Sequence, residues 1–244
     1  MAYRPGSLSQ PKALAGMIGS INAPKPATPA TVVDQLKNVQ QIKASARAFA
    51  AVLVDGSVVT LGHYTFGGDS SLVQNELTNV QQIQASRSAF AAILADGSVV
   101  TWGDKRRGGD NSEVRAHLRH VRRLEATCSA FAALLADGSV VTWGDPENGG
   151  DSSSVQDGLR NVLLIKASWS AFAAILADGS VVTWGNPLTG GDSSKVQDQL
   201  RRVQQLQATD SAFAAILADG SVLTWGSQEA GGESWEIQDQ IKAL

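Results

Sequence analysis

Short runs of hydrophobic residues, separated by turn-forming residues, recur along most of the chain. In one representative stretch, residues 162–167 and 170–176 form two such runs, and residues 180–184 form a third. The runs are rich in Val, Ile and Phe, and runs of this length bounded by Gly, Asp and Ser are typical of β-strands. The pattern therefore predicts three short strands in this stretch.

The turn between the second and third of these strands is Asp178-Gly179. Asp-Gly is a strong β-hairpin signal, because Gly accepts the positive φ angle that a tight turn between twisted strands requires. The second strand is apolar from residue 171 to residue 176, so both of its faces are predicted to be covered. We therefore expect an antiparallel pair in which the second strand is an interior strand.

This three-strand pattern is one copy of a repeat with a period of 41 residues. Five complete copies follow one another without insertion or deletion, and they begin near Val39, Val80, Val121, Val162 and Val203. Because repeats of this size cannot bury their hydrophobic residues alone, neighbouring copies are expected to stack into one body. Residues 31–244 are therefore predicted to form a single repeat domain.

Residues 1–30 differ in composition from the repeats, since they hold five of the seven prolines and no acidic residue. Such a composition is typical of a linker. We describe this segment as a Pro-rich N-terminal extension, and we expect it to pack along the array or on a partner.

A short helical turn is predicted between successive copies, because Val196, Leu200 and Val203 have the i, i+4, i+7 spacing of one helix face. Asp192 or Ser193 would be a natural N-cap for that turn. An aspartate recurs at this position, and we interpret it as a capping or turn residue. No second cluster of acids accompanies it at the spacing of a calcium loop. The recurrent residues are Asp69, Asp110, Asp151 and Asp192.

The two ends of the array carry an extra copy of this turn, which occurs six times, whereas the hairpin occurs five times. The terminal copies run from Val32 to Val39 and from Ile237 to Leu244. In a closed five-bladed ring both would compete for one groove. The sequence thus leaves open a displaced cap, an open ring and an incomplete sixth blade near Met17 and Ile18.

One repeat unit resembles the repeat of the regulator of chromosome condensation family, in a short 41-residue version. The most specific element is Asp-Gly-Ser-Val-x-Thr-Trp-Gly, which occupies residues 96–103, 137–144, 178–185 and 219–226. The first unit departs by carrying Leu61 in place of Trp. The resemblance implies an all-β fold with short helical turns, arranged as a β-propeller-like array.

Members of that family commonly have seven blades and serve as protein-binding platforms, among them a nucleotide-exchange factor for a small GTPase and a secreted inhibitor of β-lactamases. The resemblance thus implies protein binding, and guanine-nucleotide exchange is an alternative that rests on the resemblance alone. The present repeats are shorter than the family prototype. The long inserted hairpin that the exchange factor uses as a wedge is not seen.

The charge balance and the hydrophobic runs limit where the protein acts. The formal net charge of −3 argues against a general attraction to nucleic acids or anionic membranes. There is no run of about 18 apolar residues to cross a bilayer, and the N-terminus lacks the apolar core of a secretory signal. We therefore expect a soluble intracellular protein. With Cys128 as the only cysteine, an internal disulfide and a cysteine-based metal cluster are excluded.

Residues for catalysis do not converge in the sequence. Most polar residues recur in every unit, which marks them as parts of the frame. Cys128 with His117 or His120 would form a thiol–imidazole pair, but no family-specific motif surrounds the cysteine. The Gly-Gly pairs lack the Lys-Ser/Thr of a phosphate-binding loop. We therefore predict a protein that is not an enzyme and that has no metal site or cofactor.

Between the first and second strands, one position differs in every unit of an otherwise nearly invariant frame. If the blades are radial, these residues form a ring on one face, where the loops of a rigid scaffold commonly carry function. Mere exposure and drift is the alternative interpretation. The equivalent residues are Ala46, Arg87, Cys128, Trp169 and Asp210. Of these, Arg87, Cys128, Trp169 and Asp210 are predicted to bind a partner.

The fourth unit replaces the Gln-Gln pair of units one, two and five by Leu163-Leu164. An apolar patch on an otherwise polar row suggests an interface. An exposed Trp suggests the same, because aromatic anchors are enriched at binding hot spots. We therefore predict that Leu163, Leu164 and Trp169 belong to one protein contact. A Trp169 side chain folded onto the adjacent blade is the alternative.

The third unit is rich in basic residues. One interpretation is a docking patch for an acidic partner, a phosphorylated peptide or nucleic acid, since Arg suits phosphate and carboxylate groups. The other is a solvated face with neighbouring acids. The residues are Lys105, Arg106, Arg107, Arg115, Arg119, Arg122 and Arg123.

Taken together, the residues predict a non-catalytic scaffold or assembly subunit that binds another protein or a larger complex. The variable inter-strand positions would form its binding face. A nucleic-acid or phosphate-binding platform that uses the basic third repeat is the alternative.

Overall fold

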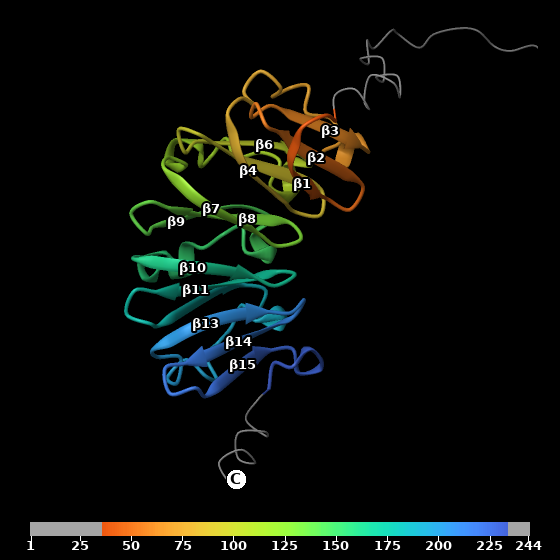
Figure 1. Ribbon diagram of the computed structural model, residues 1–244. Coiled ribbons are helices and arrows are strands. Elements are labelled where there is room, and N and C mark those ends of the chain that lie inside the picture. Colours follow the sequence, from red (N-terminus) through yellow and green to blue (C-terminus); the bar gives the residue numbers. More distant parts are fainter. Residues whose placement is uncertain (1–35, 234–244) are drawn as a thin grey trace, which may run out of the picture.

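The structure is a computed structural model that describes residues 36–233, and these residues form five three-stranded antiparallel sheets. Each sheet is built from one repeat, and we call the sheets blade 1 to blade 5 in chain order (Figure 1). The strands are β1 (Val39–Ala44), β2 (Ala48–Leu53) and β3 (Val58–Gly62); β4 (Val80–Ala85), β5 (Ala89–Leu94) and β6 (Val99–Gly103); β7 (Val121–Ala126), β8 (Ala130–Leu135) and β9 (Val140–Gly144); β10 (Val162–Ala167), β11 (Ala171–Leu176) and β12 (Val181–Gly185); and β13 (Val203–Ala208), β14 (Ala212–Leu217) and β15 (Val222–Gly226).

Short 3-10 helices lie in the segments that follow the third strand of each blade. They are η1 (Tyr64–Phe66), η2 (Lys105–Arg107), η3 (Arg115–His117), η4 (Pro146–Asn148), η5 (Ser153–Gly158), η6 (Pro187–Thr189) and η7 (Gln228–Ala230). The expected all-β architecture with short helical turns is therefore present.

Within a blade the second strand is the middle strand, as its apolar sequence predicts. In blade 4, β11 pairs with β10 on one side and with β12 on the other, both antiparallel. Gly179 in the β11–β12 turn has φ of +80°, and Asp178 Oδ1 accepts hydrogen bonds from Ser180 N at 2.9 Å and from Ser180 Oγ at 2.6 Å. The predicted Asp-Gly hairpin is confirmed.

The hydrophobic core lies between blades, in a joint that repeats along the array. In the joint between blades 4 and 5, Ala173 and Ile175 of β11 pack with Leu206 and Phe213 of blade 5. The Phe213 ring covers Gly190, and Trp225 Nε1 donates a hydrogen bond of 3.0 Å to the Gly190 carbonyl. Because the contacts are the same in each joint, the small residues of the middle strand are explained by the close approach of the next blade.

The connecting segments close these joints. Residues 194–199 form turns in place of the predicted helical turn, and Val203 already begins β13. Leu200 is nevertheless buried in the joint between blades 4 and 5. Asp192 Oδ1 accepts a hydrogen bond of 2.8 Å from Ser194 N, and Ser193 Oγ lies 2.9 Å from Thr183 Oγ1. Asp192 is therefore a turn residue, as expected. No group of three or more His, Cys, Asp or Glu side chains within residues 36–233 is placed to hold a metal ion.

The array is open, with blade 1 and blade 5 at its opposite ends (Figure 1). Phe49 of blade 1 is 51% exposed, whereas Phe213, its equivalent in blade 5, is 1% exposed. At the other end Ile216 of blade 5 is 37% exposed, whereas Ile175 in blade 4 is 5% exposed. Of the arrangements that the sequence leaves open, the described residues form the open ring.

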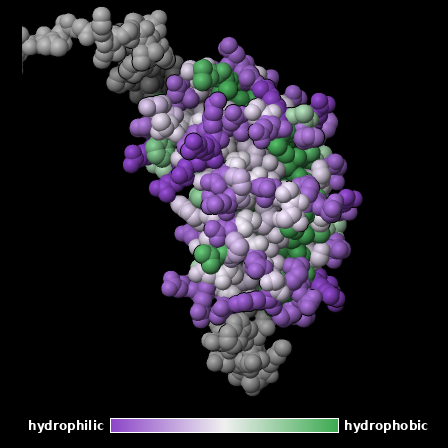
Figure 2. Space-filling view, turned by 180° about the vertical axis from the view of Figure 1, so that it is seen from behind, coloured by the Kyte–Doolittle hydropathy of each residue, from purple (hydrophilic) through white to green (hydrophobic). Residues whose placement is uncertain are grey.

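Away from the two ends of the array, most apolar side chains are buried in the joints between blades. Figure 2 shows the opposite face covered mainly by hydrophilic and intermediate side chains, with hydrophobic ones in narrow groups. The predictions for residues 1–30, for a blade near Met17 and Ile18, and for the turn from Ile237 to Leu244 lie outside the described residues.

Candidate interaction surface

The variable position of each unit lies in the turn between the first and second strands, and these turns are joined by backbone hydrogen bonds. Ala46 N donates to the Arg87 carbonyl at 2.9 Å, and Arg87 N donates to the Cys128 carbonyl at 3.0 Å. Cys128 N and Trp169 N continue the ladder to the Trp169 and Asp210 carbonyls, at 2.7 and 2.8 Å. Because only backbone atoms make this ladder, the side chains at the five positions are free to differ.

The five variable residues line one hollow of about 670 Å³. The structure thus brings Ala46, Arg87, Cys128, Trp169 and Asp210 together, although they are 41 residues apart along the chain. Small hydroxyl residues stand beside them in each unit and are used by the frame. In unit four, Ser168 Oγ accepts from Ala171 N at 3.1 Å and donates to the Thr189 carbonyl at 2.8 Å.

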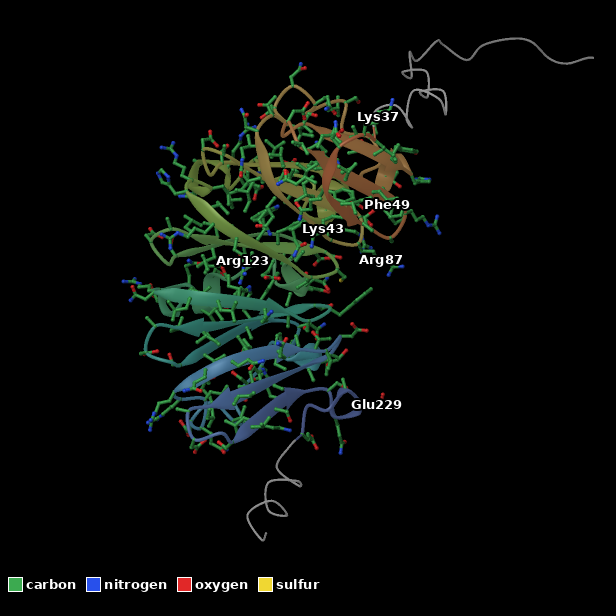
Figure 3. All side chains as sticks on the ribbon, viewed as in Figure 1. Lys37, Lys43, Phe49, Arg87, Arg123 and Glu229 are labelled. Atoms are coloured by element: carbon green, nitrogen blue, oxygen red, sulfur yellow. The ribbon has the colours of Figure 1, made fainter. Side chains whose placement is uncertain are left out.

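The most prominent side chains in this hollow are Arg87 and Trp169. The Arg87 guanidinium carbon lies 5.9 Å from the centroid of the Trp169 ring, at a distance where a cation and an aromatic face attract each other. Trp169 is 47% exposed. Arg87 is also exposed, in the turn between β4 and β5 (Figure 3). A cation from blade 2 therefore lies over a half-exposed indole from blade 4, and both side chains face solvent.

Cys128 is half-buried in the same hollow. Its Sγ lies 3.4 Å from Asn148 Oδ1 and 3.7 Å from Ser170 Oγ, so its neighbours are an amide and a hydroxyl. His117, by contrast, lines a separate groove with Trp143 and Gln156, and the contacts of Cys128 Sγ within residues 36–233 include neither His117 nor His120. The thiol therefore does not form a pair with either imidazole.

The leucine pair of unit four is divided by the structure. Leu164 packs into the joint between blades 4 and 5, whereas Leu163 is 63% exposed and lines another hollow with Arg122 and Arg123. Trp169 lines neither of these places. Leu163, Leu164 and Trp169 thus do not form one continuous patch.

The basic residues of the third unit are also distributed over several places. Arg115 forms an ion pair with Glu76, Lys105 Nζ lies 3.8 Å from Asp110 Oδ2, and Arg107 donates a hydrogen bond of 3.0 Å to Ser129 Oγ. Arg122 and Arg123 lie in the hollow beside Leu163, and Arg119 is exposed. Neighbouring acids accompany part of this set, as in the solvated-face interpretation.

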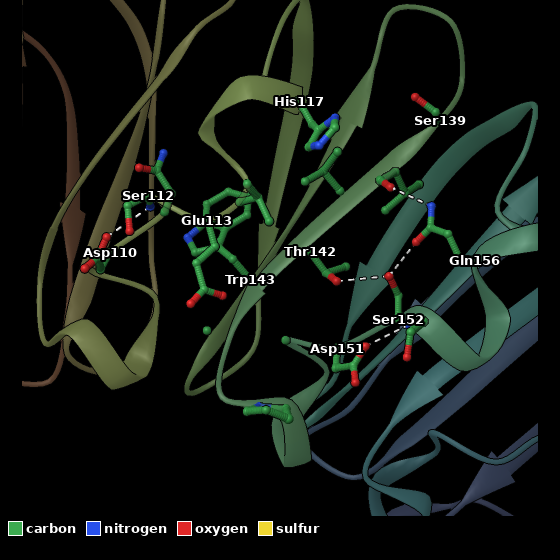
Figure 4. A pocket seen from close by; sticks show the side chains of 18 of the residues that line it. Asp110, Ser112, Glu113, His117, Ser139, Thr142, Trp143, Asp151, Ser152 and Gln156 are labelled. Atoms are coloured by element: carbon green, nitrogen blue, oxygen red, sulfur yellow. Dashed lines mark hydrogen bonds between the residues drawn. The ribbon is translucent and has the colours of Figure 1, made fainter.

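A groove of about 1150 Å³ follows β9 between two connecting segments, and the sequence did not reveal it (Figure 4). One wall is held by Ser152 Oγ, which donates to Gln156 Oε1 at 2.8 Å and lies 3.0 Å from Thr142 Oγ1. The matching Ser and Gln are replaced in the preceding segment by Asn111 and Arg115, and Asn111 Nδ2 donates to the Val99 carbonyl at 3.1 Å. That departure in one copy is the signal that could have located the groove.

The predicted site residues do not include a position on the first strands that also recurs every 41 residues and is charged in three of the five units. Its members are Lys43, Gln84, Glu125, Lys166 and Gln207. Burial raises the pKa of Glu125, and the positive charges of Lys166, Arg123 and Lys43 oppose that rise. The ionised carboxylate at this position therefore costs stability in spite of its cationic neighbours.

Replacing Glu125 by Gln is expected to stabilise the protein at neutral pH relative to the wild type. The pKa of Glu125 is higher in the folded protein than its unfolded value of about 4.5. The free energy of unfolding of the wild type is therefore highest below pH 4.5 and falls as the pH rises through the folded-state pKa. Gln84 and Gln207 show that the amide fits this position. Urea unfolding at pH 4 and pH 7 measures the effect. The prediction is contradicted if the free energy of unfolding of the wild type, compared with that of the variant, is no lower at pH 7 than at pH 4.

No helix among residues 36–233 is long and apolar enough to span a membrane. No protein-family model and no curated protein matches the sequence. Solved structures match it at low identity. Human WBSCR16 is 18% identical, with 79% of this chain and 63% of that chain covered and a TM-score of 0.51. Yeast RCC1 (Prp20) bound to Kap60 is 18% identical, with 79% and 57% covered and a TM-score of 0.51.

A second structure of Prp20p, from Saccharomyces cerevisiae, is 18% identical over 79% of this chain and 59% of that chain, with a TM-score of 0.50. This chain thus spans about six-tenths of the length of the solved structures it matches. The predicted all-β propeller-like fold, and its likeness to the regulator of chromosome condensation family, are confirmed at the level of the fold.

Proposed function

We propose that this chain, which has the fold of RCC1-type β-propellers, is a non-catalytic scaffold that binds another protein through the hollow lined by its variable residues. The observation that carries the proposal is the convergence of Ala46, Arg87, Cys128, Trp169 and Asp210 on that one hollow. Five chemically different side chains meet there on a frame that is otherwise repeated.

The chemistry of the hollow suits a protein partner. Trp and Arg are among the residues that most often anchor protein interfaces. Here the Arg87 guanidinium lies over the Trp169 ring, and both side chains are exposed. The backbone ladder fixes the five turns relative to one another, so little ordering is needed on binding. Among the similar structures, Prp20 is bound to Kap60 in one and is described by its binding to Gsp1p and histones in another.

The side chains of the hollow also lack the arrangement of a catalytic site. Nucleophilic catalysis needs a base within hydrogen-bond reach of the nucleophile, and the contacts of Cys128 Sγ are with Asn148 Oδ1 and with the hydroxyls of Ser129 and Ser170. Asp210 also lines the hollow, but it is not among the contacts of Cys128 Sγ. Binding is therefore the role that these residues support.

The proposal is tested with a double variant, Arg87→Ala with Trp169→Ala, and a matched control, Leu188→Ala. Leu188 is an exposed apolar residue of the fourth repeat, which also carries Trp169, and it does not line the hollow. Proteins captured by the tagged wild-type chain are expected to be retained by the control and to bind the double variant at least about 30-fold more weakly, since hot-spot residues contribute about 2 kcal/mol or more. An unchanged thermal unfolding curve shows that the fold is kept. Equal capture by the double variant contradicts the proposal.

A further inference from the structure

The two ends of the open array expose the two halves of a joint that the chain forms four times internally. We call the end of blade 1 that carries Ile42 and Phe49 the leading face. We call the end of blade 5 that carries Ile216, Gly220 and Gly231 the trailing face. In every internal joint, the residues equivalent to the trailing face of one blade cover those equivalent to the leading face of the next.

The aromatic contact of the joint is absent at both ends. A Cβ added at Gly190 would lie 2.5 Å from Cδ2 of Phe213, because the ring of the next blade rests on that glycine. A Cβ added at Gly231, the equivalent residue of blade 5, would meet no heavy atom of residues 36–233 within 4 Å. Phe49, the ring that corresponds to Phe213, is exposed on blade 1 (Figure 3). One end therefore has the ring and the other has its seat.

The backbone contact of the joint is likewise open. A Cβ added at Gly179 would lie 2.8 Å from the Cα atom of Arg202, which has a positive φ angle of +56°. At Gly220 such a Cβ would meet no atom of the described part of the chain within 4 Å. Asn38, at the start of blade 1, has φ of +61° and thus already has the conformation that Arg202 has in its joint. The two ends are complementary in backbone shape as well as in side chains.

We infer that the leading face of one copy of this chain docks on the trailing face of a second copy, so that the protein associates head to tail. A foreign partner would have to reproduce both the ring and the backbone conformation, whereas a second copy carries both. The internal joints show that these same residue types pack together in four places. Such an interface is heterologous, because the two copies contribute different surfaces.

One substitution makes this joint weaker than the internal ones. Trp225 and its equivalents donate an indole hydrogen bond to the glycine carbonyl of the preceding blade, at 3.0 Å for Gly190. Blade 1 has Leu61 at this position, so the Gly231 carbonyl receives no such bond from a docked copy. Association is therefore expected only at high protein concentration.

The test compares single-end variants by sedimentation over a series of concentrations. At high concentration the wild type is expected to sediment with at least twice the 25.5 kDa mass of one chain. Phe49→Asp and Ile216→Asp are each expected to stay at the mass of one chain. Leu72→Asp is the control and is expected to associate as the wild type does, because Leu72 is 99% exposed away from both faces.

Mixing the two end variants identifies the direction of docking. Phe49→Asp keeps an intact trailing face and Ile216→Asp keeps an intact leading face, so an equimolar mixture is expected to form a dimer and nothing larger. A wild type that remains a single chain at every concentration overturns the inference. Association that survives in either single variant alone, or a mixture that stays monomeric, also overturns it. None of these substitutions lies in the hollow, so the result does not depend on the proposed function.

Discussion

Replacing Phe172 by Ala is expected to lower the free energy of unfolding by about 3–5 kcal/mol, whereas the same change at Phe49 is expected to lower it by less than about 1 kcal/mol. Phe172 is completely buried, and its ring is stacked on Trp184 with 5.2 Å between the centroids. Phe49 has the same position in its repeat but lies half-exposed on the leading face. The two variants thus remove the same side chain from a covered joint and from an open one.

Urea unfolding followed by circular dichroism measures both values. The measurement is made at low protein concentration, where head-to-tail association is absent and Phe49 has no covering blade. A loss for Phe49→Ala as large as that for Phe172→Ala would show that the leading face is covered within a single chain. The open array would then be wrong.

A second large effect is expected at the glycines on which these rings rest. Gly149→Ala is expected to cost about 2–5 kcal/mol, as the sum of a left-handed backbone penalty of about 1–2 kcal/mol and an overpacking penalty of about 1–3 kcal/mol. Gly149 has φ of +90°, and an added Cβ would lie 2.6 Å from Cδ2 of Phe172. The Phe172 ring is itself buried and has no room to move aside.

Gly231→Ala is the matched control for this variant. Gly231 has φ of +88°, so the backbone penalty is the same, but an added Cβ would meet no heavy atom of the residues that the structure describes within 4 Å. The difference between the two variants therefore isolates the steric contact with the ring. Thermal unfolding monitors both, and equal losses would show that the ring does not hold the glycine site.

The strands and their order were predictable because every repeat has the same pattern of apolar runs and Asp-Gly turns. The apolar second strand can be satisfied only between two other strands and two other blades, and residues 171–176 are nearly all buried in β11. The convergence of Arg87 and Trp169 on one face was predictable as well, since equivalent turns of stacked repeats must lie on the same side.

The separation of Leu163 from Leu164 was not predictable from residue types. The pairing of β10 with β11 shifts between Val162 and Leu164, which makes Leu163 the extra residue of a β-bulge. Successive residues of a regular strand point to opposite faces. The extra residue lets Val162 and Ile165 pack in the joint between blades 3 and 4 while Leu164 packs in the joint between blades 4 and 5, and it leaves Leu163 exposed. The hydrophobicity of the pair is the same in either arrangement. The backbone irregularity alone decides which leucine is exposed.

The uniform joint has a consequence for how such a gene can change. Every unit has 41 residues, and each meets its neighbours through the same aromatic ring and the same glycine seat. Recombination between two copies at equivalent codons removes or adds one whole unit, and the new junction is the same as the old ones. The number of blades can therefore change without a new kind of contact between blades. Each added or lost unit also adds or removes one variable turn residue, which changes the side chains that line the hollow.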